Sequence, residues 1–184
     1  SRENNDDKST WDNYQSYASI IARELNADLR CISMSGIGIM VSWYPLIMPQ
    51  VYDRINPNSE FPKNDFNQWQ PDIVVVNLLQ NDDWLINRLS PIPDTEERIK
   101  HYASFIKSIR DQYQYATIFC TLGNMNITRE KSPWPGVVQA AVDSLDDSKL
   151  FFTTMSYKKT GGHPTVSEHR QMADELTPFI KSKI

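Results

Sequence analysis

The chain has 184 residues, of which 40% are hydrophobic and 23% are charged, and its formal net charge is -4. This length is sufficient for one domain with a sizeable core, and the composition is that of an ordinary globular protein. The net negative charge and the lack of a long basic run exclude nucleic acid as a partner. The apolar runs are too short to span a membrane. We therefore expect residues 1–184 to form one domain.

The first half of the chain contains two predicted helices and two predicted strands. Apolar residues recur at helical spacing over 14–25, and the apolar run 29–34 predicts a short strand. A helix is predicted over 45–55. The clearest strand is 73–78, which is β-branched and apolar without alternation, as expected for a strand that is covered on both faces.

The second half continues the alternation, with helices predicted over 94–112, 135–145 and 166–180 and strands over 116–121 and 150–153. Strands that alternate with helices predict a parallel, doubly wound sheet between two helical layers. The predicted fold class is therefore α/β, a three-layer α/β/α sandwich.

The two cysteines, Cys31 and Cys120, each fall within a predicted buried strand. We expect two free thiols in the core, although the spacing alone leaves a disulfide open. Neither has a neighbour of metal-ligating type, so no metal site is predicted, and no motif indicates a cofactor.

Candidate site residues follow three of the predicted strands. Gly36 and Gly38 come after 29–34, Asn81 and Trp84 come after 73–78, and His163 comes after the last strand. Ligands of open α/β sheets bind outside the carboxyl ends of the strands. The sequence therefore predicts that these segments converge on one edge of the sheet.

The segment around His163 suits a general base. Two glycines precede the histidine, Pro164 fixes the backbone at a helix start, and Thr165 with Glu168 forms a predicted capping box. The ring is thus held at the mouth of an anchored helix, where it can be aimed without being buried. By contrast, His169 is expected on the helix surface or in support of the site, and His101 in solvent.

Two further residues suit oxyanion donors. Asn81 can present its side-chain amide, and Gly36 allows a backbone N–H to approach a ligand closely. Each also has a simpler interpretation, because Asn-Asp pairs start turns and a glycine after a strand is often only a turn.

The motifs in combination resemble the SGNH, or GDSL-type, hydrolases. Gly36, Asn81 and His163 match the glycine, asparagine and histidine of blocks II, III and V. The phrases over 33–38, 48–54, 69–78 and 168–173 resemble, more specifically, carbohydrate esterase family 2 and its acetylxylan-esterase-like members. The resemblance covers nearly the whole chain.

The resemblance implies a flavodoxin-like strand order and a serine esterase that removes O-acetyl groups from acetylxylan or a similar polysaccharide. His163 would be the base, and Gly36 and Asn81 would form the oxyanion hole. Trp84 would offer a sugar-stacking platform, unless it only packs, and Gly38 would border the substrate. Secretion to the outside or the periplasm is expected from the family, and no signal peptide is present.

Three positions depart from the family pattern. No serine follows an apolar strand before the first helix, so we expect the first, central strand and its nucleophile upstream of Ser1, where relatives often carry a β-sandwich domain as well. The Asp that usually precedes the histidine is absent at Thr160 and Gly161, which implies a Ser-His dyad. Leu79 stands where block III usually has glycine.

Two other functions stay open at this point. The absent serine and Asp favour a carbohydrate-binding relative that has lost catalysis. An esterase or lipase for small acyl esters also fits the motifs.

Overall fold

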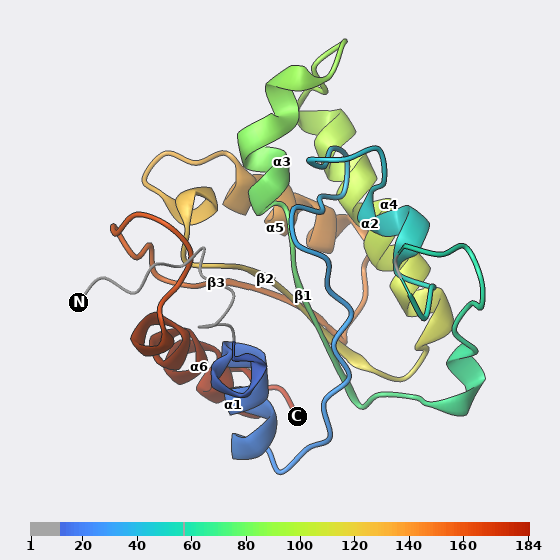
Figure 1. The fold of residues 1–184 in the computed structure, drawn as a ribbon, viewed down its shortest axis with the longest axis vertical. Coiled ribbons are helices and arrows are strands. Elements are labelled where there is room, and N and C mark those ends of the chain that lie inside the picture. The colour runs from blue at the N-terminus through green and yellow to red at the C-terminus, as the bar shows by residue number, and fades with distance from the viewer. Residues whose placement is uncertain (1–11, 57) are drawn as a thin grey trace.

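The computed structural model describes residues 12–56 and 58–184, which form a parallel sheet between two helical layers (Figure 1). The strand order is β1 (Ile73–Asn77), β2 (Thr117–Leu122), β3 (Leu150–Thr154). Asn77 lies opposite Thr121, and Thr121 lies opposite Thr153, so the three strands end close to the same level. The α/β class is thereby confirmed, and the carboxyl ends of the strands share one edge.

Helices cover both faces of the sheet, as the three-layer prediction requires. α1 (Tyr17–Glu24) packs with α6 (Val166–Lys181) on one face, and α4 (Thr95–Gln112) packs with α5 (Trp134–Ser144) on the other (Figure 1). Because side chains alternate along a strand, β2 contributes to two separate cores. Phe119 packs with α1 and α6, whereas its neighbours in β2 join the larger core on the α4 side.

Short elements complete the chain: α2 (Met48–Val51), α3 (Gln80–Leu85) and the 3-10 turns η2 (Asn13–Gln15), η3 (Phe66–Gln68), η4 (Ile86–Arg88) and η5 (Asn126–Thr128). None of the helices in the described part of the chain has the length and apolar character needed to cross a bilayer. The predicted capping box of α6 is confirmed, since Thr165 Oγ1 accepts from the Glu168 N–H and the Glu168 carboxylate accepts from the Thr165 N–H.

The strand predicted over 29–34 does not form. The segment has no ladder to any described strand, and Leu29 and Ile32 are 42% and 45% exposed. An apolar, β-favouring run becomes a strand only when a neighbour satisfies its backbone groups. The expectation that Cys31 is a core thiol is therefore wrong, because Cys31 is exposed, whereas Cys120 is buried and both thiols are free.

The helix predicted over 45–55 is also wrong in extent, because only Met48–Val51 is helical. Ile47 is still extended before it, and Arg54 after it forms an antiparallel bridge with Lys63. The backbone groups that would continue the helix are thus committed to a different partner.

One edge of β1 is open. β1 pairs with β2 on one side, and no strand of the described chain pairs with it on the other. Val75, at the middle of β1, is 36% exposed, which is unusual for a strand of this apolar composition. The sheet therefore offers a row of backbone donors and acceptors along this edge of β1.

Candidate active site

Asn81 is placed at the carboxyl end of β1 by a sharp turn into α3. The turn centres on Leu79, whose φ of 77° and ψ of -7° are left-handed and whose side chain is completely buried. This backbone conformation favours glycine, which explains why the family pattern has glycine here. The buried leucine side chain keeps the turn anchored in the core.

The Asn81 amide is held in one orientation by two hydrogen bonds. Its Nδ2 donates to the Ile37 carbonyl at 2.7 Å, and its Oδ1 accepts from Trp43 Nε1 at 3.2 Å. The two partners distinguish the nitrogen from the oxygen. One N–H of the amide is therefore used, and the second is left to act as a donor.

Gly36 lies against the same indole. Its φ of +81° is left-handed, and a Cβ at this position would lie 3.2 Å from Trp43 Cδ1. Among residues 12–56 and 58–184, no acceptor is paired with the Gly36 N–H. Trp43 thus contacts both predicted oxyanion donors, and the glycine leaves its own N–H open.

Asp82 fastens the glycine loop to α3. Its carboxylate is completely buried and accepts the N–H groups of Ile39 at 3.0 Å, Met40 at 2.7 Å and Val41 at 3.3 Å. Burial raises the pKa of Asp82, and these backbone donors partly oppose the rise. The residue next to Asn81 therefore fixes the loop that carries Gly36.

Gly38 is part of this fastening. Its N–H donates to Ser42 Oγ at 2.9 Å, and a Cβ here would lie 2.1 Å from the Val41 carbonyl oxygen and 2.5 Å from Asp82 Oδ2. The structure therefore gives Gly38 a close-packing role, in which the absence of a side chain lets the loop reach the carboxylate.

Two tryptophans flank the donors differently. Trp84, the predicted sugar platform, is 40% exposed on α3. Trp43 is 54% exposed, contacts Gly36 and Asn81 directly, and carries the Arg88 guanidinium 4.7 Å from its ring centroid. Sequence reasoning assigned neither Trp43 nor Asp82 a role beside the oxyanion donors, because these roles depend on contacts with residues about 40 positions away.

The far side of α3 is held by Asp83. Its carboxylate accepts from Arg129 Nη1 at 2.6 Å and from the indole Nε1 of Trp134 at 3.0 Å. Arg129 follows β2 and Trp134 begins α5, so the helix that bears Asn81 is fastened to the next loop along the sheet.

His163 is exposed on the loop that follows β3, at the same end of the sheet. The loop turns at Gly162, with a left-handed φ of +72°, and enters α6 through Pro164 and Thr165. The structure thus brings Gly36 and Asn81 together through Trp43, and it presents His163 on a separate loop.

Of the other two histidines, only His101 is placed as expected. His101 is exposed on α4, and His169 is half-buried on α6. The Nδ1 atom of His169 accepts the Tyr17 N–H at 3.3 Å, and the two rings stack with centroids 6.0 Å apart. Burial lowers the pKa of His169, although the charge of Glu168 opposes this, so the neutral ring is favoured. His169 therefore ties α6 to α1.

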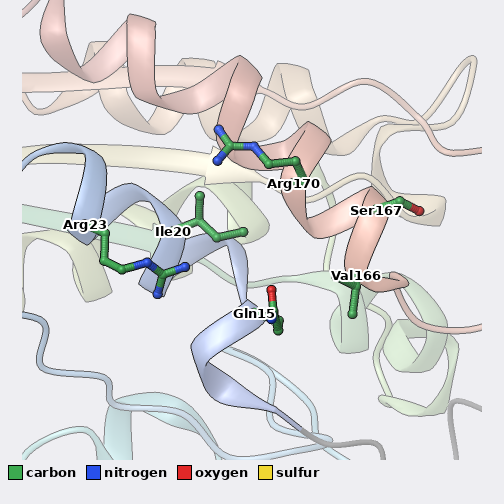
Figure 2. Close-up of a pocket in the computed structure, with 6 residues that line it drawn as sticks. All are labelled: Gln15, Ile20, Arg23, Val166, Ser167 and Arg170. Atoms are coloured by element: carbon green, nitrogen blue, oxygen red, sulfur yellow. The ribbon is translucent and has the colours of Figure 1, made fainter.

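A surface hollow of about 490 Å³ lies between α1 and the start of α6, and none of the predicted site residues lines it (Figure 2). Its two guanidiniums are already engaged, because Arg170 pairs with Glu24 and Asp174 and Arg23 lies over the Tyr14 ring. The hollow is thus a separate feature from the site at the strand ends.

No protein-family model matches the chain. It is 27% identical over 187 residues to an acetylxylan esterase / glucomannan deacetylase of Cellvibrio japonicus, an alignment that covers 96% of this chain and 51% of that protein. It is 30% identical to the cellulase/esterase CelE of Acetivibrio thermocellus, over 93% of this chain and 22% of that protein.

A solved structure of a family two carbohydrate esterase from Clostridium thermocellum in complex with cellohexaose superposes with a TM-score of 0.80. It is 32% identical, and the match covers 92% of this chain and 54% of the other. The chain thus spans about half the length of one curated relative and about a fifth of the other. These matches confirm the resemblance that the motifs indicate.

Proposed function

From the similarity of nearly the whole chain to family 2 carbohydrate esterases, we propose that it forms part of a serine esterase that removes O-acetyl groups from carbohydrates. The Cellvibrio japonicus relative is named an acetylxylan esterase / glucomannan deacetylase, and acetylxylan or a similar acetylated polysaccharide is the proposed substrate here. Secretion goes with such a substrate and is part of the proposal.

The observation that carries the proposal is the pair of donors around Trp43. Gly36 offers an N–H without a described acceptor, and Asn81 offers the second N–H of an amide whose orientation is already fixed. Donors that are held before the reaction stabilise the negative charge that develops on an acyl oxygen, and one such donor contributes about 10²–10³ to kcat. Trp43, which is 54% exposed and contacts both donors, is proposed as a support for the sugar rather than Trp84.

The proposed reaction proceeds through an acyl-enzyme. A serine Oγ attacks the acetyl carbonyl carbon while His163 takes its proton, and the Gly36 N–H and Asn81 amide bind the resulting oxyanion. The C–O bond to the sugar then breaks, and His163 returns the proton to the sugar oxygen. Water, activated by His163, releases acetate and regenerates the serine.

The nucleophilic serine is proposed to lie on a strand upstream of Ser1. The open edge of β1 supports this placement, because a parallel strand paired there would end at the same level as Asn77. The exposed apolar segment 29–34 would then gain the neighbour that it lacks. Such a strand would deliver its last residue beside Asn81 and the glycine loop.

Acetate release from acetylated xylan or mannan by the full-length protein tests the proposal. We expect release by the wild type and a loss of at least about 10³-fold in His163→Ala, because the base is removed. His101→Ala is the matched control. His101 is also an exposed histidine, but it lies on α4 and not on the loops that carry the site residues. Release that survives His163→Ala removes that residue from the mechanism.

The position of the nucleophile is tested separately with a fluorophosphonate that labels activated serines, followed by peptide mass analysis of the full-length protein. We expect one labelled serine upstream of Ser1. Labelling of any serine within 1–184 contradicts the placement. Binding of the polysaccharide without acetate release or labelling supports instead the carbohydrate-binding alternative.

A further inference from the structure

The loop that carries His163 lacks the usual Asp, yet it is organised by a different pair of charged residues. Lys158 precedes the histidine by five residues, and Glu168 follows it by five. The Lys158 side chain is only 2% exposed and the Glu168 side chain 14%, so both charged groups lie beneath the loop rather than in solvent. Charged side chains are rarely so buried unless they are paired.

The Lys158 ammonium contacts three oxygen atoms. Its Nζ donates to Thr160 Oγ1 at 2.8 Å and to the Gly161 carbonyl at 3.1 Å, and it lies 3.5 Å from Glu168 Oε2. Thr160 and Gly161 are the two positions at which the family places its orienting Asp. The loop is therefore held at these positions by a cation that binds its backbone and hydroxyl oxygens.

The Glu168 carboxylate closes the same loop. One oxygen accepts from the Thr160 hydroxyl, and the other accepts from the Thr165 N–H at 2.8 Å. Residues 160 and 165 are thus joined through one side chain, and His163 lies between the two attachment points. Desolvation opposes ionisation of Glu168, but the donors of Thr160 and Thr165 and the charge of Lys158 outweigh it and lower its pKa.

The base of the loop is fixed to the sheet. The Lys158 N–H donates to the carbonyl of Asn124, which follows β2, and the Ser156 N–H donates to Glu175 on α6. The buried lysine therefore starts from an anchored backbone position. Without such anchoring, the glycine pair before His163 would leave many conformations open to the loop.

We propose that Lys158 and Glu168 are positioning residues for His163, which hold the loop from below in place of the Asp that usually orients the catalytic histidine. The proposal rests on the proposed esterase function. Neither residue touches the reacting atoms in this account. They act by restricting where the His163 ring can lie, and misplacement of a catalytic group by about 1 Å can reduce the rate about 10²-fold.

The test compares Lys158→Met and Glu168→Gln in the full-length protein, with acetate release and amide hydrogen exchange of residues 156–165 as separate readouts. We expect kcat to fall about tenfold or more while KM stays within about twofold. Exchange of the loop should become faster in both variants. Because the two residues act on one loop, the double variant should lose little more than either single variant.

Thr165→Ala is the matched control for a purely structural role. It removes the hydroxyl that caps α6 but leaves the Thr165 N–H bonded to Glu168. The proposal requires that this variant keep most of kcat although it loses helix stability. Equal losses of kcat in Thr165→Ala and Glu168→Gln would overturn the positioning role.

Thr160→Val gives a second route if Lys158→Met does not fold, because Thr160 is exposed and its hydroxyl links both charged residues. We expect a smaller fall in kcat with the same rise in loop exchange. Unchanged loop exchange in all three variants overturns the proposal whether or not the protein releases acetate. If loop exchange becomes faster in the variants but the wild-type protein releases no acetate, the anchoring is correct and the esterase function is rejected instead.

Discussion

The two halves of the proposed site are held in different ways. The donor half, residues 36–43 with 79–84, is fixed by completely buried groups, with Leu79 in the core and the Asp82 carboxylate on three backbone N–H groups. The histidine half, residues 156–165, is a mostly exposed loop fastened by the Lys158–Glu168 ion pair, its hydrogen bonds and two backbone N–H groups at its base. An oxyanion hole requires fixed dipoles, whereas a base must reach two oxygens in succession, so the difference in anchoring suits the two roles.

The largest effect is expected from glycine substitutions that compare the halves. Gly38→Ala places a Cβ against the Val41 carbonyl and Asp82, so we expect a loss of about 3 kcal/mol or failure to fold. Gly161→Ala meets no atom within 4 Å and should gain about 0.5 kcal/mol through the unfolded state. Denaturant unfolding of both variants checks the contrast. Similar stabilities would show that the donor half is not the more tightly packed one.

The turn at Leu79 sharpens the same comparison. Leu79→Ala should lose about 3 kcal/mol, because it removes a completely buried side chain and keeps the left-handed backbone. Leu79→Gly removes more side chain but relieves a backbone penalty of about 1 kcal/mol. We expect Leu79→Gly to be no less stable than Leu79→Ala in thermal unfolding. A clearly less stable glycine variant would mean that the turn is not strained.

Removal of the Asp82 carboxylate should destabilise the donor half. Asp82→Ala leaves three backbone N–H groups without their acceptor, and we expect a loss of about 2 kcal/mol in unfolding free energy. Asp28→Ala is the control, because Asp28 is exposed. If the two variants are equally stable, the carboxylate does not fasten the loop.

The smallest expected effect is a pH dependence of the unfolding free energy, caused by His169 on α6. Burial lowers the pKa of His169 below its usual 6.5, so below about pH 6.5 the unfolded chain binds a proton that the folded chain does not. Stability should therefore fall as the pH drops from 7 to 5. Glu168 has a lowered pKa, so its contribution is lost only below about pH 4.5 and does not overlap. His169→Gln should flatten the dependence of the unfolding free energy on pH, measured by denaturant unfolding between pH 5 and 7. If the slope is unchanged, the pH dependence comes from another group.

Regular elements with a strong local pattern were predictable from the sequence. The long helix predicted over 94–112 is observed as Thr95–Gln112, and the last helix begins at its predicted capping box. Their signals lie within the element itself, in apolar spacing and in cap residues. The strand prediction for 29–34 was wrong because an apolar, β-favouring run needs a neighbouring strand, which the described residues do not supply.

The candidate site was predictable only in part, for a related reason. Gly36, Asn81 and His163 carry motif signals and could be named from the sequence, although the strand predicted before Gly36 does not form. Trp43 and Asp82 act through partners about 40 residues away in the sequence, which only the folded chain reveals.

The open edge of β1 has a consequence for handling the protein. Residues 73–77 contain no charge, proline or bulge, which are the features that natural edge strands use to resist pairing with other chains. No strand of residues 12–56 and 58–184 covers this edge, and we expect it to be a template for edge-to-edge aggregation. Concentration-dependent light scattering checks this, and Val75→Lys, at the exposed middle of the strand, should suppress it. If the apparent molar mass from light scattering does not rise with concentration, the edge does not promote aggregation.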